Sequence, residues 1–195
     1  VLLENGADPN SRDEGGATPL HMANTEGNPK ILRNLLYYGA DIKASDSRGS
    51  NPLMTAIQHN NTKFVKILLS HDEKVNPNNS IVHSKDNDLK TPLIHAADKG
   101  NNSILRKLLR HGAKLTDQDH SGKTPLHVSV IAGYYKTTEI TLNYDFGRVS
   151  KNPLETVSII SYQDISGFTP LISAIQMGNF DLVKLLLYFD KKLLT

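Results

Sequence analysis

Pairs of apolar residues recur along the chain at the spacing of a helix face. Two apolar residues are followed, after one or two positions, by two more, and this pattern places all four on one side of an α-helix. Four stretches predict amphipathic helices in this way: Ile31-Leu32/Leu35-Leu36, Phe64-Val65/Leu68-Leu69, Ile104-Leu105/Leu108-Leu109 and Leu182-Val183/Leu185-Leu186.

A short motif precedes each of these stretches, occurs once more at Thr124, and predicts a second, shorter helix. A threonine or asparagine suits the N-cap of a helix, and proline suits its first position, where a missing N–H costs nothing. A glycine or asparagine then suits the residue that ends the helix. The motifs are Thr18-Pro19-Leu20-His21, Asn51-Pro52-Leu53-Met54, Thr91-Pro92-Leu93-Ile94, Thr124-Pro125-Leu126-His127 and Thr169-Pro170-Leu171-Ile172, and the expected helix ends are Gly27, Asn60, Gly100, Gly133 and Gly178.

The motifs recur at a regular interval. Pro19 and Pro52 are 33 residues apart, as are Pro92 and Pro125, while the other two intervals are 40 and 45 residues. A period of 33 residues with a Thr-Pro-Leu-His motif resembles that of ankyrin repeats, in which each repeat is a turn followed by two antiparallel helices. The resemblance covers essentially the whole chain and implies an all-α ankyrin-repeat solenoid.

We therefore expect one ankyrin repeat domain over residues 1–195, with the end of a partial repeat in 1–12. The expected repeats are 13–45, 46–85 with an insertion, 86–118, 119–163 with an insertion, and 164–195. Both ends fall within the pattern, so we expect the chain to be a fragment of a longer protein. Small residues inside the first helices, at Ala23, Ala56, Ala96, Ser129 and Ala174, are expected to allow close helix packing.

Three departures from the pattern lead to further expectations. Leu89 stands where the other turns have glycine, which predicts a distorted third turn. Thr137, Thr138 and Thr141 interrupt an apolar stripe, which predicts a poor second helix in the fourth repeat. The insertion within 72–85 is expected to be a solvated loop, and the one within 143–163 either packs its isoleucines on the array or presents them to a partner.

Composition excludes several classes of function. Formal charge is +2 from 22 basic and 20 acidic residues, which favours neither nucleic acid nor a membrane surface as partner. The chain has no cysteine, and its histidines lack the spacing of metal ligands. Gly122-Lys123-Thr124 resembles the end of a phosphate-binding loop, but the required earlier glycine is replaced by Asp117. We expect no catalytic residues, no metal and no cofactor.

The resemblance implies a partner-binding surface on the concave face, which is formed by the turn tips and the first helices. Basic side chains are expected in its middle and apolar side chains toward its end. The candidate partner-binding residues are Arg48, His59, Lys90, Lys99, His120, Lys123, Ile131, Ile165, Phe168 and Met177.

Two functional hypotheses follow. The first is a non-catalytic, monomeric, intracellular module that binds another protein. The second is a targeting domain of a larger bacterial or viral effector or enzyme, whose catalytic part lies outside these residues.

His21 and His127, in the Thr-Pro-Leu-His motifs, are expected to make structural hydrogen bonds to the turns.

Overall fold

The computed structural model describes residues 3–76, 80–151 and 158–193. Within these residues the chain forms helices joined by turns and loops. Their bounds are η1 Leu3–Asn5, α1 Pro19–Glu26, α2 Pro29–Tyr37, α3 Pro52–Gln58, α4 Thr62–Val75, η2 Ile81–His83, α5 Pro92–Asp98, α6 Asn102–Arg110, α7 Pro125–Ile131, α8 Tyr135–Lys151, η3 Ile159–Ser161, α9 Pro170–Gln176 and α10 Phe180–Leu193.

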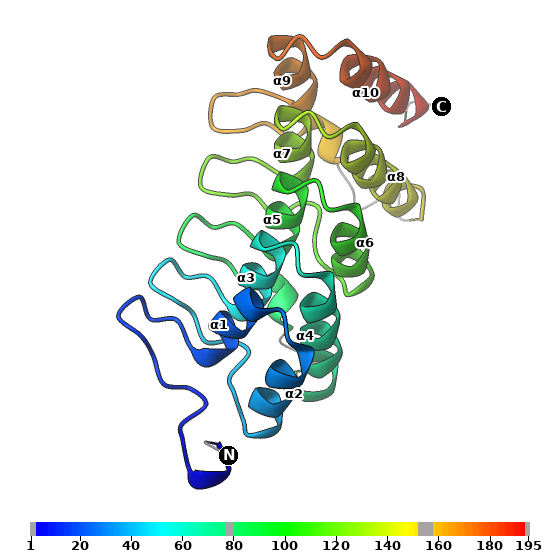
Figure 1. Ribbon diagram of the computed structural model, residues 1–195. Helices are drawn as coiled ribbons and strands as arrows, with labels where there is room; N and C mark the ends of the chain where they lie inside the picture. Colours follow the sequence, from blue (N-terminus) through cyan, green and yellow to red (C-terminus); the bar gives the residue numbers. More distant parts are fainter. Residues whose placement is uncertain (1–2, 77–79, 152–157, 194–195) are drawn as a thin grey trace.

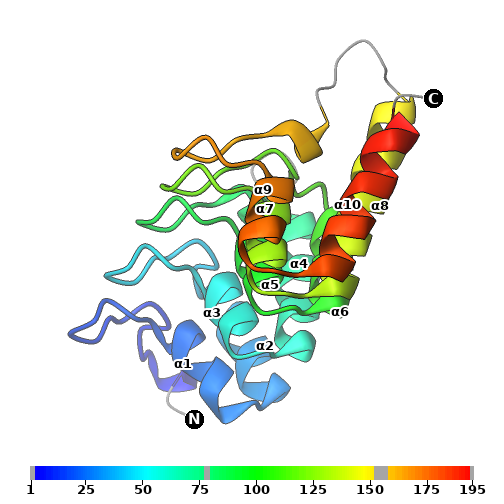
Figure 2. The same cartoon turned by 90° about the horizontal axis from the view of Figure 1, so that it is seen from above.

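The helices form two layers with a row of projecting loops on one side. The odd-numbered helices α1 to α9 stack in an inner column, and the even-numbered helices α2 to α10 stack behind them (Figure 1). Seen from above, the loops that precede each inner helix project away from the outer helices (Figure 2). This arrangement is an all-α solenoid of helix pairs, as the sequence predicts.

Local sequence explains where each inner helix begins and ends. Proline is the first residue of α1, α3, α5, α7 and α9. The N-cap side chain of Asn51 accepts a hydrogen bond from the Met54 N–H at 3.0 Å. The N-cap side chain of Thr124 likewise accepts from the His127 N–H at 3.4 Å. One or two residues after each inner helix the backbone turns left-handed, with φ of 59° at Asn60, where the other pairs have glycine.

The core lies between the two layers and between successive helix pairs. Ala56, Ala96 and Ala174 in the inner helices are 0% exposed, so their small side chains allow the neighbouring inner helices to approach closely. The paired apolar residues of the outer helices, such as Leu68 in α4 and Leu108 in α6, are also fully buried. Hydrophobic residues form only 38% of the chain, which suffices because each layer is thin.

The third turn is not distorted, so the expectation from Leu89 was wrong. Leu89 adopts φ 59°, close to the φ of 77° at Gly49 in the preceding turn. Its N–H donates to the Asp86 carbonyl at 2.9 Å, the same bond that Gly49 makes to Asp46. The turn therefore keeps its geometry, and the leucine bears a left-handed conformation that costs about 1–2 kcal/mol.

The expected poor helix in the fourth repeat was also wrong. Helix α8 runs from Tyr135 to Lys151, and its three threonines are buried rather than disruptive. Thr137 Oγ1 donates to Asn102 Oδ1 at 2.9 Å and Thr138 Oγ1 donates to Ser129 Oγ at 3.0 Å. Thr141 Oγ1 donates to the Thr137 carbonyl at 2.8 Å. Each hydroxyl has a partner, and burial therefore costs little.

The described parts of both insertions pack on the array. Residues 77–79, with Pro77, and residues 152–157, with Pro153 and Val157, lie outside the described residues. Ile81 and Val82 in η2 and Ile159 in η3 are 0–1% exposed, and Ile160 is 8% exposed. The first insertion is thus not simply a solvated loop, and the isoleucines of the second pack on the array.

The same set of hydrogen bonds holds each insertion against the helix that precedes it. In α4, the buried Asp72 carboxylate accepts hydrogen bonds from Ser80 Oγ and from the Ile81 N–H at 3.0 Å. In α8, the buried Asp145 carboxylate accepts from Ser158 Oγ and from the Ile159 N–H at 3.1 Å. Each aspartate therefore fixes the start of the short 3₁₀ turn that returns the chain to the core.

Candidate functional site

Five turns form the tips of the projecting loops, which we call fingers 1 to 5. The same pair of aspartate hydrogen bonds shapes fingers 2 to 5, and in finger 1 Asp13 Oδ1 accepts from the Ala17 N–H at 2.8 Å. In finger 3 the Asp86 Oδ1 atom accepts from the N–H groups of Asp88 at 3.0 Å and Lys90 at 2.8 Å. Asp46, Asp119 and Asp164 accept corresponding pairs of hydrogen bonds in fingers 2, 4 and 5. An aspartate that bonds to its own backbone in this way stabilises the turn. The turns are residues 13–17, 46–50, 86–90, 119–123 and 164–168.

Backbone hydrogen bonds also join each finger to the next. Each of these bonds runs from an N–H of one finger to a carbonyl of the finger before it, with N···O distances of 2.8–3.0 Å. The four pairs are Ser47 to Gly15, Asn87 to Arg48, His120 to Asp88 and Ile165 to Ser121. The fingers approach closely: a Cβ added to Gly49 would lie 2.8 Å from the Asn87 nitrogen. These four bonds form a ladder that fixes the spacing of the finger tips.

Two buried histidines tie the inner helices to the fingers. His21 Nδ1 accepts from the Thr18 N–H at 3.1 Å, and its Nε2 donates to the Ser50 carbonyl of the next finger at 3.0 Å. His127 Nδ1 accepts from the Thr124 N–H at 3.3 Å, and its Nε2 donates to the Phe168 carbonyl at 3.0 Å. The structural role expected for both histidines fits this geometry.

The same geometry requires the neutral form of both rings, because Nδ1 must accept a hydrogen bond. Burial lowers the pKa of His21 and of His127 below the ordinary value of 6.5. The carbonyl bonds and the nearby aspartates oppose this shift but do not reverse it.

A third buried histidine was not singled out from the sequence. His95 Nε2 lies 2.7 Å from Asp86 Oδ2, and both side chains are less than 10% exposed. The other oxygen of Asp86 shapes finger 3, so the pair joins α5 to its own finger. Since nine residues separate the two partners, the only signal in the sequence is that both belong to one repeat.

Four of the candidate residues line one groove on the inner face. Lys90, His120, Lys123 and Ile131 surround a groove of about 440 Å³ between fingers 3 and 4 and α7. Asp88, Asp98 and Asp119 also line it, so the two lysines face a comparable number of carboxylates. A second groove of about 310 Å³, between fingers 2 and 3, adds Arg48 and shares Lys90.

The remaining candidate residues are not among those that line these two grooves. His59 and Lys99 follow the C-terminal ends of α3 and α5 and are exposed. Met177 follows α9 and is 58% exposed. Ile165 at the tip of finger 5 is 77% exposed, whereas Phe168 is only half-buried. Apart from Ile131, the apolar candidates therefore lie outside these grooves, in the last finger and after the last inner helix, α9.

Neither metal-site clusters nor membrane-spanning helices were found within the described residues. No group of three or more His, Cys, Asp or Glu side chains there could hold a metal ion. No helix in that part of the chain is long and apolar enough to cross a membrane.

Stacked helix pairs, projecting fingers and a backbone ladder define a repeat solenoid, a class of proteins that commonly bind partners on an extended face. The family models described as ankyrin repeats (3 copies) match residues 1–79 and 78–152, and ankyrin repeats (many copies) match 148–187. The chain belongs to the ankyrin repeat family. Repeats of this family generally mediate protein–protein interaction.

Similar curated proteins come from a virus and a plant. An ankyrin repeat protein of Acanthamoeba polyphaga mimivirus is 24% identical over 106 residues, or 54% of this chain and 13% of that protein. The potassium channels AKT1 and SKOR of Arabidopsis thaliana are 40% and 41% identical over 93% and 95% of this chain. The matched region spans only 19% and 20% of the two channels. The chain thus corresponds to a minor part of each relative.

Proposed function

We propose that the chain is a non-catalytic module that binds a segment of a partner protein along its inner face. The observation that supports this most directly is the ladder between the fingers. It holds the tips at a fixed spacing before any partner arrives, so that binding requires little ordering of the backbone. Family membership supports the same proposal, because ankyrin repeats generally bind proteins.

In this proposal the two kinds of candidate residue have different roles. Arg48, Lys90, His120 and Lys123 form hydrogen bonds and ion pairs with polar side chains of the partner. His59 and Lys99 extend that polar surface along the helix ends, and Ile131 adds an apolar contact to the groove.

At the other end of the inner face, exposed apolar side chains contribute most of the affinity. Ile165 and Met177 are more than half exposed, and Phe168 lies between them in the sequence. Such side chains are typical of the residues that dominate binding energy.

The test begins with capture of partners from a cell lysate by the immobilised chain, followed by affinity measurements on each purified partner. Phe168→Ala with Met177→Ala should weaken binding by about 1–2 kcal/mol or more. Tyr188→Ala serves as control, since Tyr188 is 60% exposed but belongs to outer helix α10. Unchanged affinity in the double variant, with helicity intact, would contradict the assignment of these residues.

A second candidate function follows from the lengths of the relatives. Because the chain matches only 13–20% of three longer proteins, we infer that it acts as the recruiting domain of a larger protein. That protein would be a bacterial or viral effector or an enzyme whose catalytic part lies elsewhere, acting in the cytoplasm. The full open reading frame tests this inference: a neighbouring catalytic domain supports it, and its absence refutes it. We also expect a monomer in solution, which light scattering can check.

A further inference from the structure

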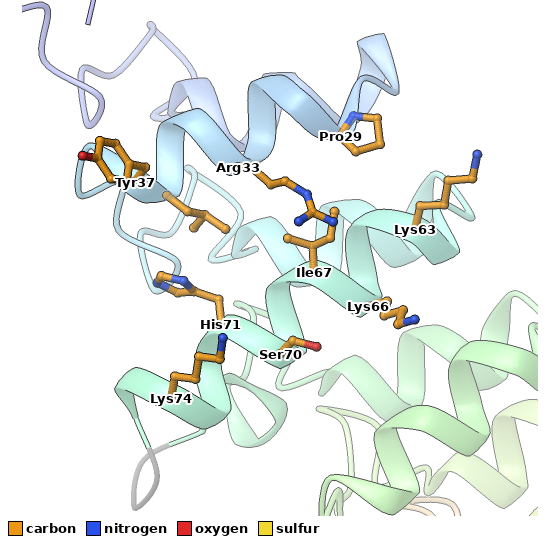
Figure 3. Close-up of a pocket in the computed structure, with 10 residues that line it drawn as sticks. Pro29, Arg33, Tyr37, Lys63, Lys66, Ile67, Ser70, His71 and Lys74 are labelled. Atoms are coloured by element: carbon orange, nitrogen blue, oxygen red, sulfur yellow. The ribbon is translucent and has the colours of Figure 1, made fainter. Parts of the chain in front are cut away.

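A basic groove lies on the side of the array opposite the fingers, between outer helices α2 and α4. Its volume is about 680 Å³. Figure 3 shows the side chains that line it. Arg33 and Leu36 come from α2, and Lys63, Lys66 and Ile67 come from α4. Spacings of three and four residues place each set on one face of its helix, so that the two faces converge on the groove.

The groove carries an excess of positive charge. Arg33, Lys63, Lys66 and Lys74 line it, and no aspartate or glutamate does among the side chains that the structure describes. Within the described residues, none of these four cations forms an ion pair.

The acidic residues of α4 are directed elsewhere. The Asp72 carboxylate is 2% exposed and bonds to the turn at Ser80 and Ile81. Glu73 Oε1 lies 3.0 Å from His111 Nε2, at the end of α6. The positive charge of the groove is therefore not neutralised by its own helix.

Apolar side chains form the floor between these cations. Leu36 is 9% exposed and Ile67 is half-buried, and Figure 3 shows the Arg33 side chain extending from α2 toward Ile67. The corresponding groove between α8 and α10 differs, because Glu139 and Asp181 line it together with its lysines. The combination of an apolar floor and unopposed cations thus distinguishes the groove between α2 and α4.

We propose that this groove binds an acidic, amphipathic segment of a partner protein. An apolar side chain of the segment packs on Leu36 and Ile67, and flanking carboxylates pair with Arg33, Lys63 and Lys66. Lys63 and Lys74 are eleven residues apart on α4, a rise of about 16 Å that matches about three turns of a helical segment. A nucleic acid would leave the apolar floor without a partner, and the inner face has mixed charge rather than a continuing basic surface.

The test uses fluorescence anisotropy with the intact chain and a labelled synthetic peptide of about three helical turns. The peptide carries leucine at intervals of three and four residues and glutamate elsewhere. A second peptide replaces every glutamate with glutamine. Lys63→Glu with Lys66→Glu should weaken binding of the acidic peptide by about tenfold or more, and the glutamine peptide should bind as weakly.

Lys85→Glu with Lys114→Glu is the matched control, because both lysines are exposed, lie outside the groove and give the same change in net charge. This control should keep the wild-type affinity within about twofold. Circular dichroism checks folding, which charge reversal at two exposed positions near the N-terminus of α4 should not harm.

Three outcomes would overturn the proposal. They are no binding of the acidic peptide, equal losses in the groove variant and the control, or tighter groove-dependent binding of an oligonucleotide or of phosphatidylserine vesicles. Lys90→Glu with Lys123→Glu on the inner face should leave peptide binding unchanged. If the groove proposal is overturned, the proposal that the inner face binds a partner still stands, because the Phe168 and Met177 variants test it separately.

Discussion

Replacing Asp72 with alanine tests whether a single carboxylate fixes the return of the first insertion. Asp72 is 2% exposed in the last turns of α4 and accepts hydrogen bonds from Ser80 Oγ, from the Ile81 N–H at 3.0 Å and from Asn76 Nδ2 at 3.0 Å. The alanine variant removes the two carboxylate oxygens and with them all three hydrogen bonds. The apolar residues of η2 stay in place only if the backbone that carries them remains ordered.

The expected loss follows from the environment of each donor. The Ile81 N–H is buried, so leaving it without a partner costs about 1–3 kcal/mol. Ser80 and Asn76 are half-buried and can bond to water instead, at a loss of about 0.5–1 kcal/mol each. Alanine regains about 0.5 kcal/mol of helix propensity, and removing a negative charge near the helix C-terminus regains a similar amount. The free energy of unfolding should therefore fall by about 1–4 kcal/mol.

Urea unfolding monitored by circular dichroism measures this loss. Asp190→Ala, the same change at an exposed position of α10, should alter the free energy of unfolding by less than about 0.5 kcal/mol. Hydrogen exchange at the Ile81 amide should accelerate more than exchange in α10. Equal effects of the two substitutions, or an unchanged exchange rate at Ile81, would refute the assigned role.

Two further substitutions and one change of pH test groups that are strained or buried. Leu89→Gly should raise the free energy of unfolding by up to about 1 kcal/mol, measured by urea unfolding, because glycine adopts φ 59° without strain. No increase would contradict strain at that turn. Asn51→Thr should raise the melting temperature by about 2–4 °C, since the buried Asn51 Nδ2 has no hydrogen-bond partner among the described residues; a lower melting temperature would argue against this. Acidification below the ordinary histidine pKa of 6.5 should destabilise the fold, because the pKa of His21 and of His127 is lowered and the unfolded chain binds more protons. The slope approaches about 1.4 kcal/mol per pH unit for each histidine until its folded pKa is reached. Urea unfolding at a series of pH values checks it, and the same slope in His21→Asn with His127→Asn would exclude these two residues as its source.

Most of the fold could be predicted because its signals are local. Thr91 and Pro92 specify the start of α5 through a cap and a fixed backbone angle, and Gly100 specifies its end. Apolar residues at helical spacing, such as those around Leu105, specify the outer helices. None of these features depends on which other segment lies nearby.

The wrong predictions from the sequence concern residues whose conformation depends on partners elsewhere in the chain. Thr138 is unfavourable in an apolar stripe unless Ser129 in the preceding helix accepts its hydroxyl, and the sequence does not show that pairing. Asp72 and Asp145 gave no signal that they would hold the insertions, since their partners are eight to fourteen residues away. Leu89 follows its neighbours because the finger determines the backbone more strongly than one side chain does.

The candidate site could be predicted only as a list of exposed positions. The sequence placed Lys90, Lys123 and Ile131 on the same face, but it did not show that the Asp119 side chain lies in their groove. Nor did it indicate the basic groove on the outer face. That groove depends on the lateral fit of α2 against α4, so neither helix shows it alone.

In the ladder between the fingers, backbone hydrogen bonds hold the tips in place, whereas side chains at the tips can contact a partner. Each rung uses a backbone N–H and a carbonyl, and the four donors are a serine, an asparagine, a histidine and an isoleucine. Side chains at these positions can therefore change, during evolution or in the laboratory, without removing a rung. Proline is the exception because it has no N–H to donate. A library that varies Ser47, Asn87, His120 and Ile165 over every residue except proline should keep the spacing of the tips while it alters what they recognise.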